Sequence, residues 1–260
     1  MRMPYKIIEL DTVDSTNNYA KRELLGIENR TVIKALSQTS GRGQRGNVWK
    51  SDAGRNLLLS VVIKYNSDNC NFQIPASSQM AISCMTALSV VKALESLHIE
   101  ARIKWPNDIY IGDRKVCGIL IENSINGSLL SSSIIGVGIN VNQLDFDDDI
   151  PNPISLAQCT GLSYDIDEVM LVFLHEFDKL LTQFAYGRMD YELLRSIYTE
   201  HLWQLNRTRE FIDRRSPQVT PFTGMIRGIL NDGRLVIETD GGTREFAFNE
   251  VSYLRTNSVL

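Results

Sequence analysis

The order of hydrophobic and polar positions predicts short strands and longer helices along the chain. Between the first two strands, "DSTNNYAKRELLG" predicts a helix with Asp14 or Ser15 as its N-cap and Gly26 as its end. The apolar, partly β-branched third run is typical of a buried strand. The three strand predictions are Lys6–Leu10, Thr31–Leu36 and Asn56–Tyr65.

Three further segments repeat apolar residues every three or four positions, which predicts amphipathic helices packed on a sheet. Ser77 or Ser78 is the expected N-cap of the first, whose apolar positions run from Met80 to Leu94. The other two helices are expected at Asp167–Tyr186, ended by Gly187, and at Tyr191–Leu205.

The remaining apolar runs predict antiparallel strands. Hairpin turns at Gly112-Asp113 and Asn126-Gly127 divide Arg102–Val141 into several strands, and the acidic stretch Asp145–Pro153 is a loop. The stretch Arg214–Pro221 has the composition of a linker. After it, runs that alternate apolar and polar residues predict a small β-barrel. We therefore expect an α+β protein, with a larger domain over residues 1–213 and a small β domain over residues 220–260.

Composition and charge narrow the function. A net charge of -4 argues against a general nucleic-acid binder, and no apolar run is long enough to span a membrane. The N-terminus lacks the apolar core of a signal peptide, the four cysteines form no C-x-x-C pair, and the three histidines show no metal-ligand spacing. We expect a reduced, cytoplasmic protein without a protein-bound metal.

The stretch "SQTSGRGQRGNVW", residues 37–49, carries three glycines interleaved with Arg42, Gln44 and Arg45. Glycine allows close backbone approach, and arginine presents a planar fork to carboxylate or phosphate. A solvated surface turn explains the same residues about as well. A dinucleotide-binding interpretation fails because no βαβ pattern follows, and a P-loop fails because no G-K-[ST] closes the glycines.

The stretch "KWPNDIYI", residues 104–111, gives a second candidate cation. Pro106 interrupts strand pairing and keeps Trp105 out of helical conformation, so Lys104 is expected at a strand end, held by the sheet. A lysine in that position presents one charge to a phosphate or carboxylate. Taken alone, it is more typical of a snorkelling lysine beside a structural Trp-Pro corner.

Three segments in this order, "GRGQRG" with Trp49, "KWPNDIYIGDRKVCGILIE" and "GVGINVN", resemble those of the biotin–protein ligases. The C-terminal "FNEVSYLR" is similar to the end of that family's final barrel. The resemblance covers nearly the whole chain. It implies a mixed or antiparallel sheet flanked by helices, the class II synthetase-like biotin/lipoate ligase fold, with a small C-terminal Src-homology-type β-barrel.

The resemblance also implies a two-step reaction. Biotin and ATP, the latter with Mg²⁺, form biotinyl-5′-AMP and pyrophosphate, and a lysine of a biotin carboxyl carrier domain then takes the biotinyl group. Matching positions give Arg42 and Lys104 as catalytic residues. The implied biotin-binding residues are Ser15, Thr16, Asn17, Gln38, Arg42, Gly43, Gln44, Lys104, Gly118, Ile119 and Leu120. The implied nucleotide-binding residues are Gly41, Arg45, Trp49, Asn107, Asn140, Asn142 and Arg255.

Several of these positions have a structural interpretation as well. Ser15 is also a helix cap, Trp49 is as well suited to core packing, and turn chemistry at a strand end explains Asn140 and Asn142 equally well. Gln44 and Asn47 stand where the family commonly has arginine, which removes two charges from the loop.

Other interpretations remain open. A lipoate or octanoate ligase or transferase shares the fold, but a transferase needs a nucleophilic cysteine, and Cys117 lies in a strand expected to be buried. A non-catalytic biotin or nucleotide sensor could lose Lys104, which is present here. The position of "STNN" near the start leads us to expect a ligase without the DNA-binding domain of larger relatives. The sequence leaves a homodimer open.

Overall fold

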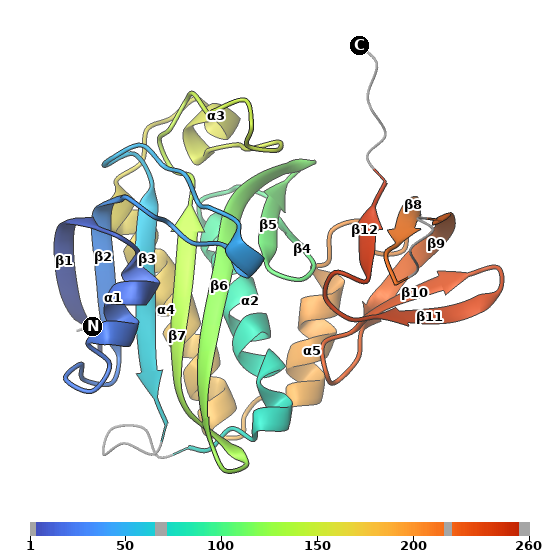
Figure 1. The fold of residues 1–260 in the computed structure, drawn as a ribbon, viewed down its shortest axis with the longest axis horizontal. Helices are drawn as coiled ribbons and strands as arrows, with labels where there is room; N and C mark the ends of the chain where they lie inside the picture. The colour runs from blue at the N-terminus through green and yellow to red at the C-terminus, as the bar shows by residue number, and fades with distance from the viewer. Residues whose placement is uncertain (1–3, 66–71, 216–219, 255–260) are drawn as a thin grey trace.

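The computed structural model describes residues 4–65, 72–215 and 220–254, which form two β-sheets joined by helices (Figure 1). The larger sheet has the order β1-β2-β3-β7-β6-β5-β4. β1 pairs parallel with β2 and the other pairs are antiparallel, so the sheet is mixed, as predicted. Its strands are β1 (Lys6–Val13), β2 (Thr31–Gln38), β3 (Leu57–Lys64), β4 (Arg102–Lys104), β5 (Asp108–Ile111), β6 (Arg114–Asn126) and β7 (Leu129–Ile139).

Two long helices, α2 (Met80–Ser96) and α4 (Ile166–Ala185), cover one face of this sheet and bury the main core, while α1 (Thr16–Arg22) lies on the other face (Figure 1). β3 is buried on both faces, which explains its unbroken apolar sequence. The shorter elements are α3 (Leu156–Thr160), α5 (Tyr191–Glu200) and two 3₁₀ turns, η1 (Gln44–Gly46) and η2 (Ala76–Ser78).

The C-terminal sheet is antiparallel, with the order β11-β10-β9-β8-β12. Its first strand precedes the predicted linker, so this sheet begins upstream of the expected boundary at residue 213. Residues 216–219 of that linker lie outside the described residues. The strands are β8 (Thr208–Asp213), β9 (Thr220–Ile229), β10 (Leu235–Thr239), β11 (Gly242–Phe246) and β12 (Val251–Tyr253).

Three helix ends differ from the sequence prediction. Ser15 is the N-cap of α1, as predicted, although its side chain makes no capping bond. The helix ends at Arg22 rather than at Gly26, and the Gly26 and Ile27 amides both donate to the Glu23 carbonyl. Gln79, rather than a serine, precedes α2, because Ser78 belongs to the 3₁₀ turn η2.

The helix expected at Tyr191–Leu205 ends at Glu200. The chain beyond it pairs with β4 instead: the Ile103 amide donates to the His201 carbonyl, and the Trp203 amide donates to the Ile103 carbonyl. This pairing places Trp203 beside the strand that ends at Lys104. The competing sheet contacts therefore shorten α5.

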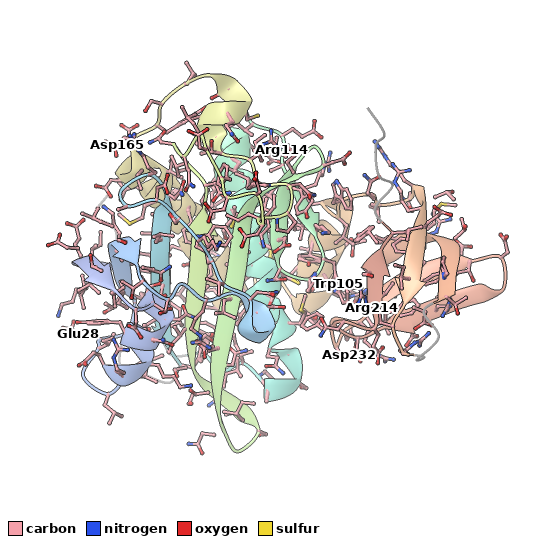
Figure 2. All side chains as sticks on the ribbon, turned by 45° about the horizontal axis from the view of Figure 1, so that its top comes forward. Glu28, Trp105, Arg114, Asp165, Arg214 and Asp232 are labelled. Carbon is pink, nitrogen blue, oxygen red and sulfur yellow. The ribbon has the colours of Figure 1, made fainter. Side chains whose placement is uncertain are left out.

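The two sheets meet through backbone carbonyls of the C-terminal module. Trp105 Nε1 donates to the Gly233 carbonyl at 2.9 Å, Arg195 Nη1 to Ile229 at 2.7 Å, and the Tyr191 hydroxyl to Asn231 at 2.7 Å. Trp105 lies on the side of the large sheet nearest the C-terminal sheet in Figure 2, where Arg214 and Asp232 are also labelled. These bonds bring β8 and β12 beside the strand ends of the larger sheet.

Candidate active site

A cavity of about 1510 Å³ lies between the glycine-rich loop, the larger sheet and the C-terminal sheet. The N-terminal turn of α1 and the loop line one part, and the middle of β6 and β7 lines another. Lys104 and the Trp-Pro corner extend the lining to residues of β8 and β12. The segments that the sequence analysis singled out separately therefore surround one space.

Three glycines form part of the wall of this cavity. Gly136 and Gly138 are two residues apart on β7, so they share a face, and Gly118 on β6 pairs with Gly138. A β carbon at Gly136 would lie 2.4 Å from Asn17 Oδ1, and one at Gly138 would lie 2.6 Å from Trp49 Cε2. Glycine at these positions lets the two side chains lie directly on the sheet.

Trp49 packs its indole on this glycine surface. A β carbon at Gly118 would lie 2.8 Å from Trp49 Cζ3, and Lys115 Nζ is 5.5 Å from the Trp49 ring centroid. Among the described residues, the buried Nε1 of Trp49 has no hydrogen-bond partner. The indole therefore lies with its Nε1 against the sheet and offers an apolar surface to a ligand in the cavity.

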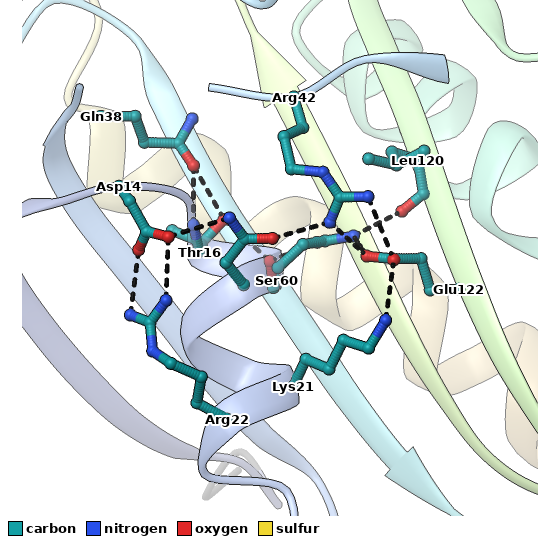
Figure 3. Close-up of polar contacts among 11 residues, drawn as sticks. Asp14, Thr16, Lys21, Arg22, Gln38, Arg42, Ser60, Leu120 and Glu122 are labelled. Atoms are coloured by element: carbon teal, nitrogen blue, oxygen red, sulfur yellow. Dashed lines mark hydrogen bonds and ion pairs between the residues drawn. The ribbon is translucent and has the colours of Figure 1, made fainter. Parts of the chain in front are cut away.

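Next to the glycine wall lies a buried cluster of uncharged polar side chains (Figure 3). The Thr16 amide donates to Gln38 Oε1 at 2.7 Å, and this bond fixes which end of the Gln38 amide is the acceptor. Ser60 Oγ lies 2.8 Å from Thr16 Oγ1 and 2.6 Å from Asn17 Oδ1. Asn17 Nδ2 donates to the Leu120 carbonyl at 3.2 Å. This cluster suits a ligand that is polar but uncharged.

Arg42 reaches from the glycine-rich loop to this cluster. Its Nη1 and Nη2 donate to the two oxygens of Glu122, at 3.0 and 3.2 Å, and Nη1 also donates to Asn18 Oδ1 at 2.8 Å. Figure 3 shows Arg42 and Lys21 approaching the Glu122 carboxylate from the loop and from α1. The loop cation is thus paired with a protein anion in this structure.

The position of Glu122 affects its pKa. Partial burial alone would raise the pKa of the carboxyl, but hydrogen bonds from Arg42 and Asn17 and the charges of Arg42 and Lys21 outweigh burial and lower it. Glu122 is therefore ionised at neutral pH and holds Arg42 against β6.

Lys104 ends β4, as the sequence predicts, among aromatic rings. Its Nζ donates to the Tyr110 hydroxyl at 2.8 Å. The same nitrogen lies 4.6 Å from the Tyr110 ring centroid, 6.0 Å from that of Trp203 and 5.6 Å from that of Tyr253. Tyr253 belongs to the C-terminal sheet, so both sheets contribute to the surroundings of this lysine.

Most of the predicted site residues line the cavity. Their binding roles stay predictions, but the structure brings their side chains or backbone to one place. These residues are Ser15, Thr16, Asn17, Gln38, Arg42, Gly43, Gln44, Trp49, Lys104, Asn107, Gly118, Ile119 and Leu120.

Asn140 and Asn142 do not line the cavity. Asn140 Nδ2 donates to the Ile154 carbonyl at 3.1 Å, and Asn142 Nδ2 donates to the Tyr164 carbonyl at 2.7 Å. Both amides hold the loop after β7, which is the turn role left open by the sequence. Their predicted nucleotide contact is therefore not supported by their position.

Four other predicted positions have different outcomes. Gly41 is buried within the loop and does not line the cavity, and a β carbon there would lie 2.3 Å from the Trp49 carbonyl oxygen. The side chain of Arg45 and the whole of Arg255 lie outside the described residues, so their roles stay predictions. Asn107 lines the cavity, but its Nδ2 donates to the Ile119 carbonyl at 2.9 Å.

Sequence reasoning missed several residues of the site. Ser60 was missed because it lies in an otherwise apolar strand. Glu122 was missed because nothing in the sequence indicates its ion pair with Arg42. Gly136 and Gly138 did carry a signal, since glycines two apart in a strand leave one face open. Trp203 and Tyr253 carried none, because they approach Lys104 only through the packing of the second sheet.

Among the described residues, neither a cluster of metal ligands nor a cysteine lines the cavity. Residues 4–65, 72–215 and 220–254 contain no group of three or more His, Cys, Asp or Glu side chains placed to hold a metal ion. Cys117 is fully buried, and burial raises the pKa of its thiol, which disfavours the thiolate. In the part of the chain with described structure, no helix is both long and apolar enough to cross a bilayer.

Two family profiles match the chain. The biotin/lipoate A/B protein ligase family matches residues 9–140, which are 132 of the 260 residues. The biotin protein ligase C-terminal domain matches residues 218–254. The chain belongs to the biotin/lipoate A/B protein ligase family, and its C-terminal region matches the domain of biotin protein ligases.

Individual relatives agree with this assignment. The bifunctional ligase/repressor BirA of Bacillus spizizenii is 30% identical over 253 residues, which cover 94% of this chain and 72% of that protein. The biotin–[acetyl-CoA-carboxylase] ligase of Paracoccus denitrificans is 24% identical over 94% of this chain and 99% of its own length. The structure of the Aquifex aeolicus biotin protein ligase in complex with biotin and ATP superimposes with a TM-score of 0.76 at 27% identity, covering 96% of this chain and 99% of that chain.

Proposed function

We propose that this protein is an ATP-dependent biotin–protein ligase. It activates biotin as biotinyl-5′-AMP and transfers the biotinyl group to a lysine of a biotin carboxyl carrier domain. One observation supports this choice most strongly: a single cavity combines a buried, uncharged polar cluster with two cations, Arg42 and Lys104. The cluster suits the ureido ring of biotin, and the cations suit its carboxylate and the phosphates of ATP.

The first step joins two anions. A carboxylate oxygen of biotin attacks the α-phosphorus of ATP, the bond to the β-phosphate oxygen breaks, and pyrophosphate leaves with that electron pair. Cations fixed near the meeting point lower the barrier because they stabilise the charge that accumulates in the transition state. Lys104, held at a strand end by β5 and its aromatic neighbours, is placed for this role.

In the second step the amine of the carrier lysine attacks the acyl carbon of the adenylate. The C–O bond to AMP breaks, an amide forms, and the amine loses a proton. The adenylate must be protected from water until the carrier arrives. The glycine-rich loop is folded over β6 through Trp49 and Arg42, which suits it to cover the intermediate.

Magnesium fits this site only as a companion of the nucleotide. Mg²⁺ commonly binds through substrate phosphates and few protein carboxylates. Asp108 is a carboxylate of the cavity wall, and it is paired with Lys115 at 2.7 Å. We infer that any magnesium enters with ATP, and that the chain's own residues supply binding and positive charge.

The test is exchange of labelled pyrophosphate into ATP with biotin, lipoate or octanoate as the acid. The proposal predicts exchange with biotin alone, followed by transfer to a purified carrier domain of a biotin-dependent carboxylase. Lys104→Ala should lower the exchange rate by about 10²–10³-fold if it stabilises the transition state. Exchange only with lipoate or octanoate would assign a different acid, and binding of biotin without exchange would indicate a sensor.

The carrier as partner rests on the names of the relatives, among which acetyl-CoA carboxylase appears as the target. A homodimer and a cytoplasmic location stay predictions. β1 is an edge strand of the larger sheet and could pair with a second copy. The molar mass in solution, measured by light scattering with and without biotin and ATP, tests the dimer.

A further inference from the structure

Lys104 is surrounded by three aromatic residues from three separate parts of the chain. Tyr110 lies on β5 in the same hairpin, Trp203 follows α5, and Tyr253 is on β12 of the C-terminal sheet. Their ring centroids are 4.6, 6.0 and 5.6 Å from Lys104 Nζ. We call these three residues the aromatic cage.

The cage is itself a packed unit. The ring centroids of Tyr110 and Trp203 are 5.3 Å apart, and those of Trp203 and Tyr253 are 4.8 Å apart in an edge-to-face arrangement. Trp203 Nε1 donates to the Gly112 carbonyl at 2.8 Å, which fixes its indole to the β5–β6 turn. Tyr253 packs on Phe211 of β8 at 5.2 Å, so the core of the C-terminal sheet supports it.

Such rings act on a lysine in two ways. The negative π faces attract the ammonium, and the attraction is stronger in a site sheltered from water. The rings also remove rotamers from a side chain that otherwise loses considerable entropy when it is held in one place. A lysine held in this way meets its anion already oriented, which is the condition for effective electrostatic stabilisation.

We propose that Trp203 and Tyr253 are positioning residues for Lys104 in adenylate formation, an inference that rests on the proposed function. The C-terminal sheet therefore acts on the reaction through one ring: Tyr253 completes the cage only when β12 is docked against the larger sheet. The hydroxyl of Tyr253 is buried and has no hydrogen-bond partner among the described residues, so the ring is the active part of this side chain.

The proposal predicts a specific pattern of substitutions. Tyr253→Leu removes the ring and should lower kcat for pyrophosphate exchange by about 3- to 30-fold, the range that cation–π contacts correspond to. The KM values for biotin and ATP should change less than kcat. Tyr253→Phe keeps the ring and should retain nearly full activity. Trp203→Leu should behave like Tyr253→Leu.

A double-mutant cycle with Lys104→Met separates positioning from general damage to the fold. If Tyr253 acts through Lys104, then Tyr253→Leu should have little further effect once Lys104 is methionine. Affinity for a non-reactive sulfamate analogue of biotinyl-5′-AMP, measured by calorimetry on the same four proteins, gives a second cycle that does not depend on low residual rates.

Phe222→Leu is the matched control. Phe222 stacks on Phe211 in the same sheet, with ring centroids 5.6 Å apart, but does not line the cavity. Its loss should lower the melting temperature and leave kcat near the parent value. Equal losses from Tyr253→Leu in both backgrounds, or an equal loss of kcat from Phe222→Leu, would overturn the positioning role. A parent protein without biotin-dependent exchange would instead remove the proposed function, and this inference with it.

Discussion

The guanidinium of Arg42 is the clearest case in which one residue has two potential partners. In the structure it donates to Glu122 and Asn18, and Glu122 also accepts from Asn17 at 2.9 Å. One carboxylate therefore fixes both the loop and the polar cluster. A ligand that recruits Arg42 must compete with Glu122, so this ion pair helps to set how firmly the loop is held against β6.

Glu122→Gln tests this ion pair. The variant should keep the fold but hold the loop less firmly, because an amide replaces the carboxylate that accepts two charge-assisted bonds from Arg42. Limited proteolysis within residues 42–45 should become faster in the absence of ligand, and biotin with ATP should suppress it. Equal cleavage of parent and variant would show that Glu122 does not restrain the loop.

At the scale of elements, the missing side chains at two glycines of β7 create part of the surface of the cavity. Gly136 and Gly138 give room for Asn17 and Trp49, while Ile135, Val137 and Ile139, on the opposite face, belong to the core under the helices. The strand therefore serves the core with one face and the cavity with the other.

Gly138→Ala should displace the Trp49 indole, because the added methyl would lie 2.6 Å from an atom of a rigid ring. We expect biotin affinity to fall by about 1–3 kcal/mol, in line with overpacking elsewhere. Calorimetric titration with biotin measures it. Gly26→Ala, whose β carbon meets only the Glu23 carbonyl oxygen at 3.8 Å, is the control and should bind normally.

Asp213 gives the C-terminal sheet a predictable response to pH. Hydrogen bonds from Arg215, at 2.8 to 3.1 Å, together with the nearby Arg244, lower the pKa of this carboxyl from 3.8 to about 2. A folded-state pKa below the unfolded value stabilises the fold above pH 3.8, and that contribution is lost as the pH falls towards 2.

Asp213→Asn should therefore lower the unfolding free energy at neutral pH by about 1–2 kcal/mol, since a bond to a charged group is lost. The difference between parent and variant should shrink as the pH falls from 3.8 towards 2. Urea unfolding monitored by circular dichroism over this range measures it. A difference that stays constant with pH would assign the effect to packing instead of charge.

At the scale of the whole molecule, the features that depend on local sequence pattern were predicted better than those that depend on long-range packing. The periodicity of α4 and the turn residues around β6 placed those elements within a residue or so, because apolar spacing and turn chemistry act locally. The end of α5 was misplaced because pairing of the His201–Trp203 segment with β4 decides it. In the same way, the sequence indicated Lys104 as a site residue but not Trp203 or Tyr253, whose approach depends on how the two sheets dock.

A substitution of Trp105 tests how much its contacts stabilise the docking of the two sheets. Its indole is buried, packs on Phe248 with ring centroids 5.2 Å apart, and donates to the Gly233 carbonyl. Trp105→Phe removes the donor and leaves this carbonyl buried without its partner, so the unfolding free energy should fall by about 1–3 kcal/mol.

Tyr191→Phe provides the comparison, because it removes a bond to the neighbouring Asn231 carbonyl at a more exposed position. At this position water can replace the lost partner, so the unfolding free energy should fall by less than about 1 kcal/mol. Thermal and urea unfolding of both variants gives the contrast. Similar losses in the two proteins would mean that burial at this junction is unimportant.

The residues that line the cavity also determine the tryptophan fluorescence of the protein. The chain contains three tryptophans, and all three, Trp49, Trp105 and Trp203, belong to the cavity wall. Indole emission responds to local polarity and to nearby quenching groups, so the tryptophan fluorescence of the entire molecule originates in this one place. Every change in its intensity or wavelength on adding biotin, nucleotide or adenylate therefore reports the site without a label, and single Trp→Phe replacements would assign each part of the signal to the loop, the strand corner or the aromatic cage.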